Sequence, residues 1–172
     1  MSPELDKKLC DKYPELFVNR HAPETETAMC WGFEVEDGWY PLIDFLCAKL
    51  MYPVTVLRSR IADGRYEGEA LEEIKKELAE AEKYIPVVSQ VKEKFAGLRF
   101  YVESWTDEQY RMISFVEDLS YHVCEECGTM DNVMVYHRSW MKTLCPVHAD
   151  QRYGSEVAES LRKFHESKNR SV

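Results

Sequence analysis

Four side chains near the C-terminus constrain the fold of this chain more than any other feature. Cys124 and Cys127 are separated by two residues, and after seventeen further residues Cys145 and His148 repeat that spacing. A two-residue gap lets one tight turn direct two donor atoms at the same ion, and Gly128 suits such a turn. The pattern predicts one structural Zn²⁺ held by three thiolates and one imidazole, with no coordination position left for water.

Some alternatives for this cluster remain open at the level of sequence. His122 or His137 could replace His148 as the fourth ligand, because both are close to the cysteine pairs along the chain. A redox pair formed by two of the cysteines would leave the other two ligands unused, and an iron–sulfur cluster would prefer a fourth cysteine. The other three cysteines are predicted to be small apolar residues of the interior: Cys10, Cys30 and Cys47.

The residues around the cluster predict a treble-clef-like zinc unit. Residues 132–136 are strand-like, residues 139–144 could return beside them, and Pro146 is tolerated in the first turn of a helix. The stretch from Pro146 to Glu166 is predicted to be helical, and one face of it carries four apolar residues: Tyr153, Val157, Leu161 and Phe164. The expected fold class is α+β, mostly helical, with a small antiparallel sheet and this unit at the C-terminal end.

Two parts of the chain are expected, an acidic α+β body at residues 1–120 and the zinc-binding unit at residues 121–172. The body is predicted to contain helices at 3–13, from about 42 to Pro53, at 69–85, at 87–96 and at 106–122, with strands near 29–40 and 98–104. The pattern Thr-Asp-Glu-Gln at 106–109 is typical of a capping box that opens the last of these helices. Its inward face is predicted to carry Met112, Phe115, Val116 and Leu119.

Charge is distributed unevenly between the two parts. The chain has 31 acidic and 22 basic residues, and residues 121–172 hold seven of each, so the first 120 residues carry 24 acids against 15 bases. Because Lys and Arg supply most of the affinity for phosphates, the acidic body is a poor candidate for binding nucleic acid. No stretch approaches the roughly 18 consecutive apolar residues of a membrane helix, and the N-terminus lacks an export signal. We expect no membrane partner.

Three segments carry a resemblance to a known family. They are TETAMCWGFEVEDGWYPLIDFLC (25–47), VKEKFAGLRFYV (91–102) and CEECG…TLCPVHAD (124–150). Together they resemble a family of small uncharacterised proteins encoded by bacteriophages and prophages, and the similarity covers most of the chain. The resemblance implies a zinc site at the two Cys/His pairs and a setting in the cytoplasm of an infected bacterial host cell. It implies no particular reaction.

The first functional hypothesis is a non-enzymatic zinc-binding protein whose partner is a bacterial host protein. Such a protein would inhibit a host factor or a defence component. Surplus acid at residues 34–44 and 67–82 would let its surface imitate a nucleic-acid backbone. This hypothesis follows from the resemblance to phage-encoded proteins and from the absence of a recognisable catalytic motif in the sequence.

Two other functions are weighed against it. A nucleic-acid-binding accessory protein would use basic residues of the zinc unit that alternate with aromatic ones, namely Arg138, Lys142 and Arg152. A nuclease-like enzyme would use His137 in the zinc hairpin, but it would need further ligands on the following helix. That helix offers Asp150 and His165, about four turns apart. The sequence therefore favours binding over catalysis.

Overall fold

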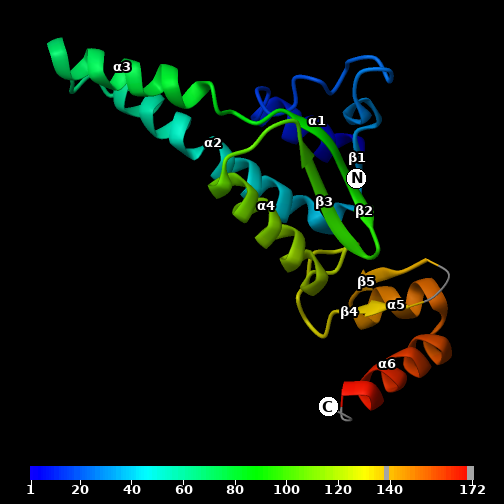
Figure 1. Ribbon diagram of the computed structural model, residues 1–172. Coiled ribbons are helices and arrows are strands. Elements are labelled where there is room, and N and C mark those ends of the chain that lie inside the picture. The colour runs from blue at the N-terminus through cyan, green and yellow to red at the C-terminus, as the bar shows by residue number, and fades with distance from the viewer. Residues whose placement is uncertain (138–139, 170–172) are drawn as a thin grey trace.

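Helices predominate in the structure, and they surround one three-stranded and one two-stranded sheet (Figure 1), as the predicted α+β class requires. The computed structural model describes residues 1–137 and 140–169, and residues 165–169 by their backbone alone. The elements in chain order are α1 (Pro3–Lys12), η1 (Ala28–Trp31), β1 (Phe33–Glu34), η2 (Asp37–Trp39), α2 (Tyr40–Ala62), α3 (Gly68–Glu82), β2 (Val88–Lys94), β3 (Gly97–Val102), α4 (Asp107–Leu119), η3 (Ser120–His122), β4 (Met134–Tyr136), β5 (Lys142–Leu144), α5 (Pro146–Tyr153) and α6 (Ser155–Asn169).

The larger sheet has the order β1-β2-β3. Strand β1 runs parallel to β2, and β3 runs antiparallel to β2. Its central strand β2 occupies the segment for which a helix was predicted, and that prediction is wrong. Val88 and Val91 are β-branched and fully buried, and both edges of the strand find hydrogen-bonding partners. Phe95 and Ala96, both at positive φ, then form the tight turn into β3 without the glycine that usually reveals such a turn.

Helix α2 begins directly after the 3₁₀ turn at Asp37–Trp39 and continues to Ala62. The prediction that Pro53 ends this helix is therefore wrong. A proline removes one helical hydrogen bond and bends the helix, but tertiary packing can outweigh that cost. Here Leu50 and Val54, on either side of the proline, are buried in the core, and this burial stabilises the helix across Pro53.

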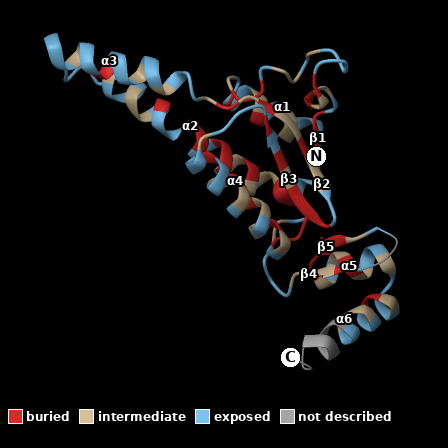
Figure 2. Ribbon diagram, in the orientation of Figure 1, coloured by how far each residue is buried: buried red, intermediate tan, exposed pale blue. Residues whose placement is uncertain are grey.

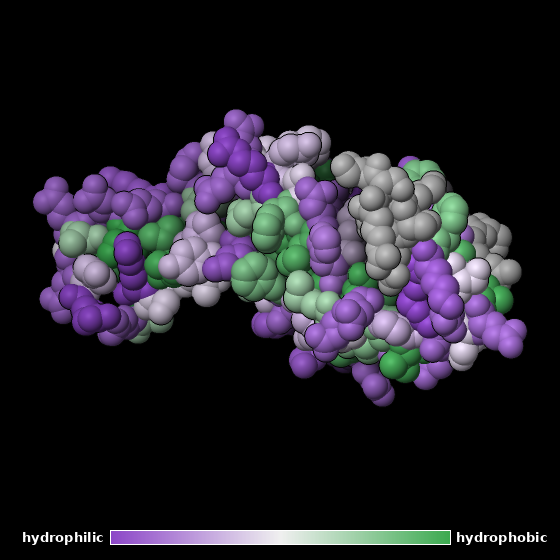
Figure 3. Space-filling view, turned by 90° about the horizontal axis from the view of Figure 1, so that it is seen from below, coloured by the Kyte–Doolittle hydropathy of each residue, from purple (hydrophilic) through white to green (hydrophobic). Residues whose placement is uncertain are grey.

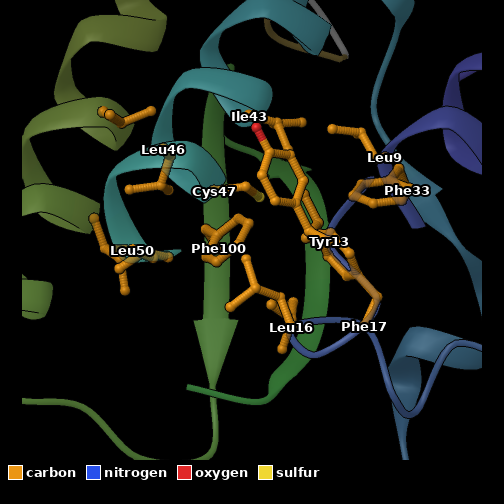
Figure 4. Close-up of a cluster of buried hydrophobic side chains, with 14 of the residues drawn as sticks. Leu9, Tyr13, Leu16, Phe17, Phe33, Ile43, Leu46, Cys47, Leu50 and Phe100 are labelled. Atoms are coloured by element: carbon orange, nitrogen blue, oxygen red, sulfur yellow. The ribbon is translucent and has the colours of Figure 1, made fainter. Parts of the chain in front are cut away.

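The main hydrophobic core lies between α1, α2 and the sheet. Figure 4 shows Leu46, Cys47 and Leu50 of α2 directed toward Phe100 of β3. The chain after α1 closes the other side of this cluster with Tyr13, Leu16 and Phe17, of which Phe17 packs edge-on against Phe33. Burial of the Cys47 thiol raises its pKa well above the ordinary value, so Cys47 is a small apolar core residue, as expected.

Helix α4 starts at the predicted capping box. The Thr106 hydroxyl accepts the Gln109 amide N–H, and the Gln109 side chain accepts the Thr106 amide N–H. The predicted inward face is only partly correct, because Ile113 and Val116 are buried whereas Phe115 is 64% exposed. The apolar residues of α4 therefore extend around the helix beyond the side that packs against the body.

The second half of α2 and the whole of α3 project from the body as a helical pair, and most of α3 is exposed (Figures 1 and 2). Ile74 is the buried residue of α3. By length and composition alone, the segment Asp37–Ala62 could also cross a membrane. A helix that packs into a core meets the same criterion, and the first half of α2 does so.

The C-terminal unit consists of the β4–β5 hairpin followed by α5 and α6, the order expected for a treble clef. The helix predicted to run to Glu166 is interrupted, because Gly154 adopts a φ of +81° between α5 and α6. The two helices fold against one another (Figure 1). They share a small core with the hairpin, and its buried side chains outside the metal cluster are Tyr136, Leu144, Ala149 and Ala158. The division of the chain at residue 120 stays a prediction.

Candidate metal centre

The four predicted ligands come from two short segments that the fold brings together. Cys124 and Cys127 lie in the turn after η3, where the Gly128 amide donates to the Cys124 carbonyl at 2.8 Å and Gly128 has a φ of +76°. Cys145 is the N-cap residue of α5, and His148 lies in its first turn. The partial positive charge at a helix N-terminus favours a thiolate, so this position suits a metal-binding cysteine.

The donor atoms are spaced for a single ion. The Nδ1 atom of His148 lies 3.7 Å from Sγ of Cys124 and 3.2 Å from Sγ of Cys145. All four donor atoms lie within 4.8 Å of one another. A tetrahedral zinc site with sulfur ligands at about 2.3 Å has ligand–ligand distances of about 3.8 Å. The group could therefore hold one four-coordinate metal ion with only small side-chain adjustments.

The alternative ligands lie outside this group. Among the residues that the structure describes, His122 and His137 do not belong to the cluster, and both are exposed at the surface. Cys10 and Cys30 are half-buried in the N-terminal part of the chain. Burial, helped by the charge of Asp6, raises the pKa of Cys10 to about 12, so its thiol stays protonated and unreactive.

The two buried thiols of the cluster differ in acidity. Burial raises the pKa of Cys124 to about 11. Burial is also the largest influence on Cys145 and raises its pKa, but hydrogen bonds from the His148 amide and ring and from the neighbouring thiols lower it to about 7. Metal ligands must be deprotonated, so Cys145 offers a thiolate at neutral pH, and Cys124 would release its proton when a cation binds.

A buried ion pair connects the first cysteine turn to the hairpin. The Lys142 ammonium donates to both carboxylate oxygens of Glu125 at 2.8 Å, and its nitrogen lies 3.6 Å from Glu93 of β2. Glu125 is fully buried, and desolvation raises its pKa although Lys142 opposes the shift. The Trp140 indole N–H also donates to Glu93, at 3.0 Å. These contacts anchor the unit to the β2–β3 hairpin.

Gly38 and Trp39 of η2 make a second junction with the cysteine turn. The Gly38 amide donates to the Glu125 carbonyl at 2.8 Å, and the Trp39 indole donates to the Val123 carbonyl at 2.9 Å. A Cβ atom at residue 38 would collide with the Cys124 carbonyl oxygen and would lie 2.5 Å from the Glu125 carbonyl oxygen. The turn can therefore approach only because residue 38 has no side chain.

The variant Gly38→Ala is expected to lose about 3 kcal/mol of unfolding free energy, because backbone atoms of the cysteine turn must move away. Urea denaturation followed by tryptophan fluorescence measures this loss. Gly64→Ala is the matched control, since Gly64 has a φ of +69° but no neighbour within 4 Å. It should cost about 1 kcal/mol through backbone strain alone. Equal losses in the two variants would contradict the proposed junction.

The basic residues considered for nucleic-acid binding do not form a common exposed face among the described residues. Arg138 lies outside the described part of the chain. Lys142 is buried and paired with Glu125, an arrangement that does not favour contact with a phosphate. Arg152 is exposed, but its guanidinium is 3.1 Å from the Glu126 carboxylate.

Sequence reasoning missed the residues that support the cluster from outside. Glu125, directly after the first cysteine, had no pattern to distinguish it from a surface acid, and Glu93 was placed on a helix. A signal did exist at Gly38, because a glycine is often found where another backbone segment approaches closely. Compared with protein families, curated proteins and solved structures, the chain gives no match in any of the three.

Proposed function

We propose that this protein is a non-enzymatic zinc-binding protein that acts by binding another protein. Zinc is the favoured ion because three thiolates and one imidazole in a tetrahedral group are typical ligands of structural zinc. All four coordination positions would be occupied by protein side chains. The bound ion would then crosslink the cysteine turn to α5, and Lys142 would join the Glu125 of that turn to Glu93 of the body.

The observation that carries the binding proposal is a group of exposed aromatic side chains beside β3. Trp105 and Tyr110 are each 57% exposed, and their ring centroids lie 6.4 Å apart. With Tyr101, which is 39% exposed, they line a shallow cavity of about 180 Å³ whose floor includes Phe100 and Ile113. We call Tyr101, Trp105 and Tyr110 the aromatic slot.

The aromatic slot has the chemistry of a protein-binding anchor site. Trp and Tyr dominate the energetics of protein–protein interfaces because they bury a large area at a small cost in side-chain entropy. Glu117 lines the same cavity, and burial raises the pKa of its carboxyl group. The slot therefore suits a partner segment with an apolar or aromatic side chain flanked by a hydrogen-bond donor.

The proposed partner is a bacterial host factor or defence component, and the protein would act in the bacterial cytoplasm. This part of the proposal rests on the resemblance to phage-encoded proteins. Imitation of a nucleic-acid backbone by the acidic helix α3 receives less support, because three of its glutamates pair with basic side chains: Glu72 with Lys75, Glu80 with Lys83 and Glu82 with Arg58. The aromatic slot is the better candidate for the contact surface.

The proposal is tested by capture from a bacterial lysate with the immobilised, metal-loaded protein. We expect the wild type to retain a specific protein, and the double variant Trp105→Ser/Tyr110→Ser to lose at least about 90% of it, as loss of two anchors predicts. Mass spectrometry identifies and quantifies what is retained. The control is Trp31→Ser, because Trp31 is 65% exposed but belongs to η1, outside the slot.

Two results would contradict the proposal. One is equal retention by the wild type and the slot variant, which would place the contact elsewhere. The other is retention of DNA instead of protein, with an affinity that falls steeply as salt is raised and that weakens in Arg138→Ala and Arg152→Ala. That second result would establish the nucleic-acid-binding alternative.

A further inference from the structure

A second apolar surface lies on the side of α4 that faces α2. Phe115 of α4 is 64% exposed, and Phe45 and Tyr52 of α2 are 54% and 60% exposed. We call this surface the α2–α4 face and define it by Phe45, Lys49, Tyr52, Glu108, Met112 and Phe115. Seen from below, the molecule shows one group of hydrophobic side chains near its middle and others toward its two ends (Figure 3).

The residues of the α2–α4 face repeat with the same spacing on both helices. On α2 the face residues are 45, 49 and 52, and on α4 they are 108, 112 and 115. Both sets follow the i, i+4, i+7 pattern with which helices pack against other helices. A groove of about 310 Å³ lies between α2, α4 and the segment at the end of α3, and Lys49, Tyr52, Glu108 and Met112 are among the residues that line it.

The groove presents one positive and one negative side chain, Lys49 and Glu108. The Lys49 ammonium lies 5.3 Å from the centroid of the Phe45 ring and 5.8 Å from that of the Tyr52 ring. Within the described part of the chain, neither Lys49 nor Glu108 forms a salt bridge. A helix that fills this groove should therefore carry apolar residues at helical spacing, an acid opposite Lys49 and a base opposite Glu108.

The α2–α4 face itself meets that requirement, and we propose that its occupant is a second copy of this chain. In a two-fold symmetric pair the same patch faces itself, so Lys49 of each copy can meet Glu108 of the other. The two α2–α4 pairs would then form a four-helix layer with Phe45, Met112 and Phe115 in its interior. The self-complementary charges set the register of the two copies.

The exposed area is close to what a dimer of this kind needs. Phe45, Tyr52 and Phe115, with the neighbouring Tyr84 at 55%, are each more than half exposed. At about 200 Å² for a whole aromatic side chain, they leave about 450 Å² per copy available for burial. Two copies would bury about 900 Å² through these four residues alone, near the roughly 1,000 Å² that marks a specific interface.

This inference does not rest on the proposed function. Trp105 and Tyr110 of the aromatic slot line the cavity toward β3, whereas the α2–α4 face is on the side of α4 toward α2. The dimer would therefore leave the slot open to a partner. Failure of one proposal leaves the other standing.

The test is the mass of the metal-loaded protein in solution, measured by sedimentation equilibrium across a range of concentrations. We expect a reversible dimer with a dissociation constant on the order of 10 μM, as suits an interface of this size. The single variants Lys49→Glu and Glu108→Lys should each raise that constant about tenfold or more through like-charge contacts. The double variant Lys49→Glu/Glu108→Lys should restore the wild-type constant, which a merely destabilised chain would not do.

Phe115→Ser and Trp31→Ser complete the set as an interface variant and an exposed control. Phe115→Ser is expected to weaken the dimer at least tenfold, and Trp31→Ser is expected to leave it unchanged. A wild-type protein that stays monomeric up to about 200 μM would overturn the proposal. So would a dimer whose dissociation constant is unaffected by both charge reversals, or a monomer that binds vesicles of neutral phospholipid through Phe115.

Discussion

The variant Cys127→Ser is expected to lose its metal ion and the folded structure of the C-terminal unit. The hairpin, α5 and α6 share a core whose buried side chains include two alanines and few large residues. A core of that size does not stabilise some fifty residues without a crosslink. Metal binding contributes roughly 10 kcal/mol or more to folding in small zinc peptides, so removal of one ligand should unfold the unit.

Elemental analysis and limited proteolysis together measure this effect. The wild type should contain about one zinc per chain, as expected for a single four-ligand site, and Cys127→Ser should contain almost none. Proteases should cut the variant after residue 123 while sparing residues 1–120. Cys30→Ser is the matched control, because Cys30 is half-buried and lies outside the cluster. A fully folded wild type without metal would contradict the structural role of the ion.

The second large effect is expected for Lys142→Met, which removes one partner of the buried ion pair. Glu125 would then keep a carboxylate in the interior without a counter-charge, and Glu93 would add repulsion. Breaking a buried pair in this way costs about 3–5 kcal/mol. Urea denaturation of the metal-loaded protein should show a loss of this size in the free energy of unfolding.

A double variant separates the charge effect from the loss of packing. Lys142→Met/Glu125→Leu replaces both charges with apolar groups of similar size, and it should recover most of the stability that Lys142→Met loses. Lys7→Met serves as the exposed control, because the Lys7–Asp11 pair is 73% and 64% exposed and should contribute little. If the double variant is as unstable as the single one, the destabilisation comes from packing and not from the unpaired carboxylate.

Several elements were predictable because their signals are local. The capping box at Thr106 satisfies backbone amides within one turn, so the start of α4 needs no tertiary contact to be recognised. Apolar residues at helical spacing likewise predicted a helix at 69–85, where the structure has α3. The metal cluster was predictable for the same reason, because each pair of ligands needs only one tight turn to bring its two donor atoms together.

Other elements depended on partners distant in the chain. The segment Val88–Lys94 is a strand because Phe33–Glu34 and Gly97–Val102 pair with its two edges, and nothing within the segment itself reveals those neighbours. The continuation of α2 past Pro53 likewise needs the core to compensate for the missing hydrogen bond. The intrinsic helix or strand propensity of a segment predicts its structure poorly where strand pairing and burial outweigh it.

The spacing of the residues predicted the three cysteines of the candidate metal centre and the mostly helical α+β class, and the composition gave the surplus of acid in the body. The choice of His148 over His122 and His137 needed the folded structure. Only the tertiary structure decided that Lys142 is an internal counter-charge and that Phe115 faces solvent. The reason is that a side chain is buried or exposed according to which other segment covers it. That covering segment is chosen by the whole fold and not by the residues nearby in sequence.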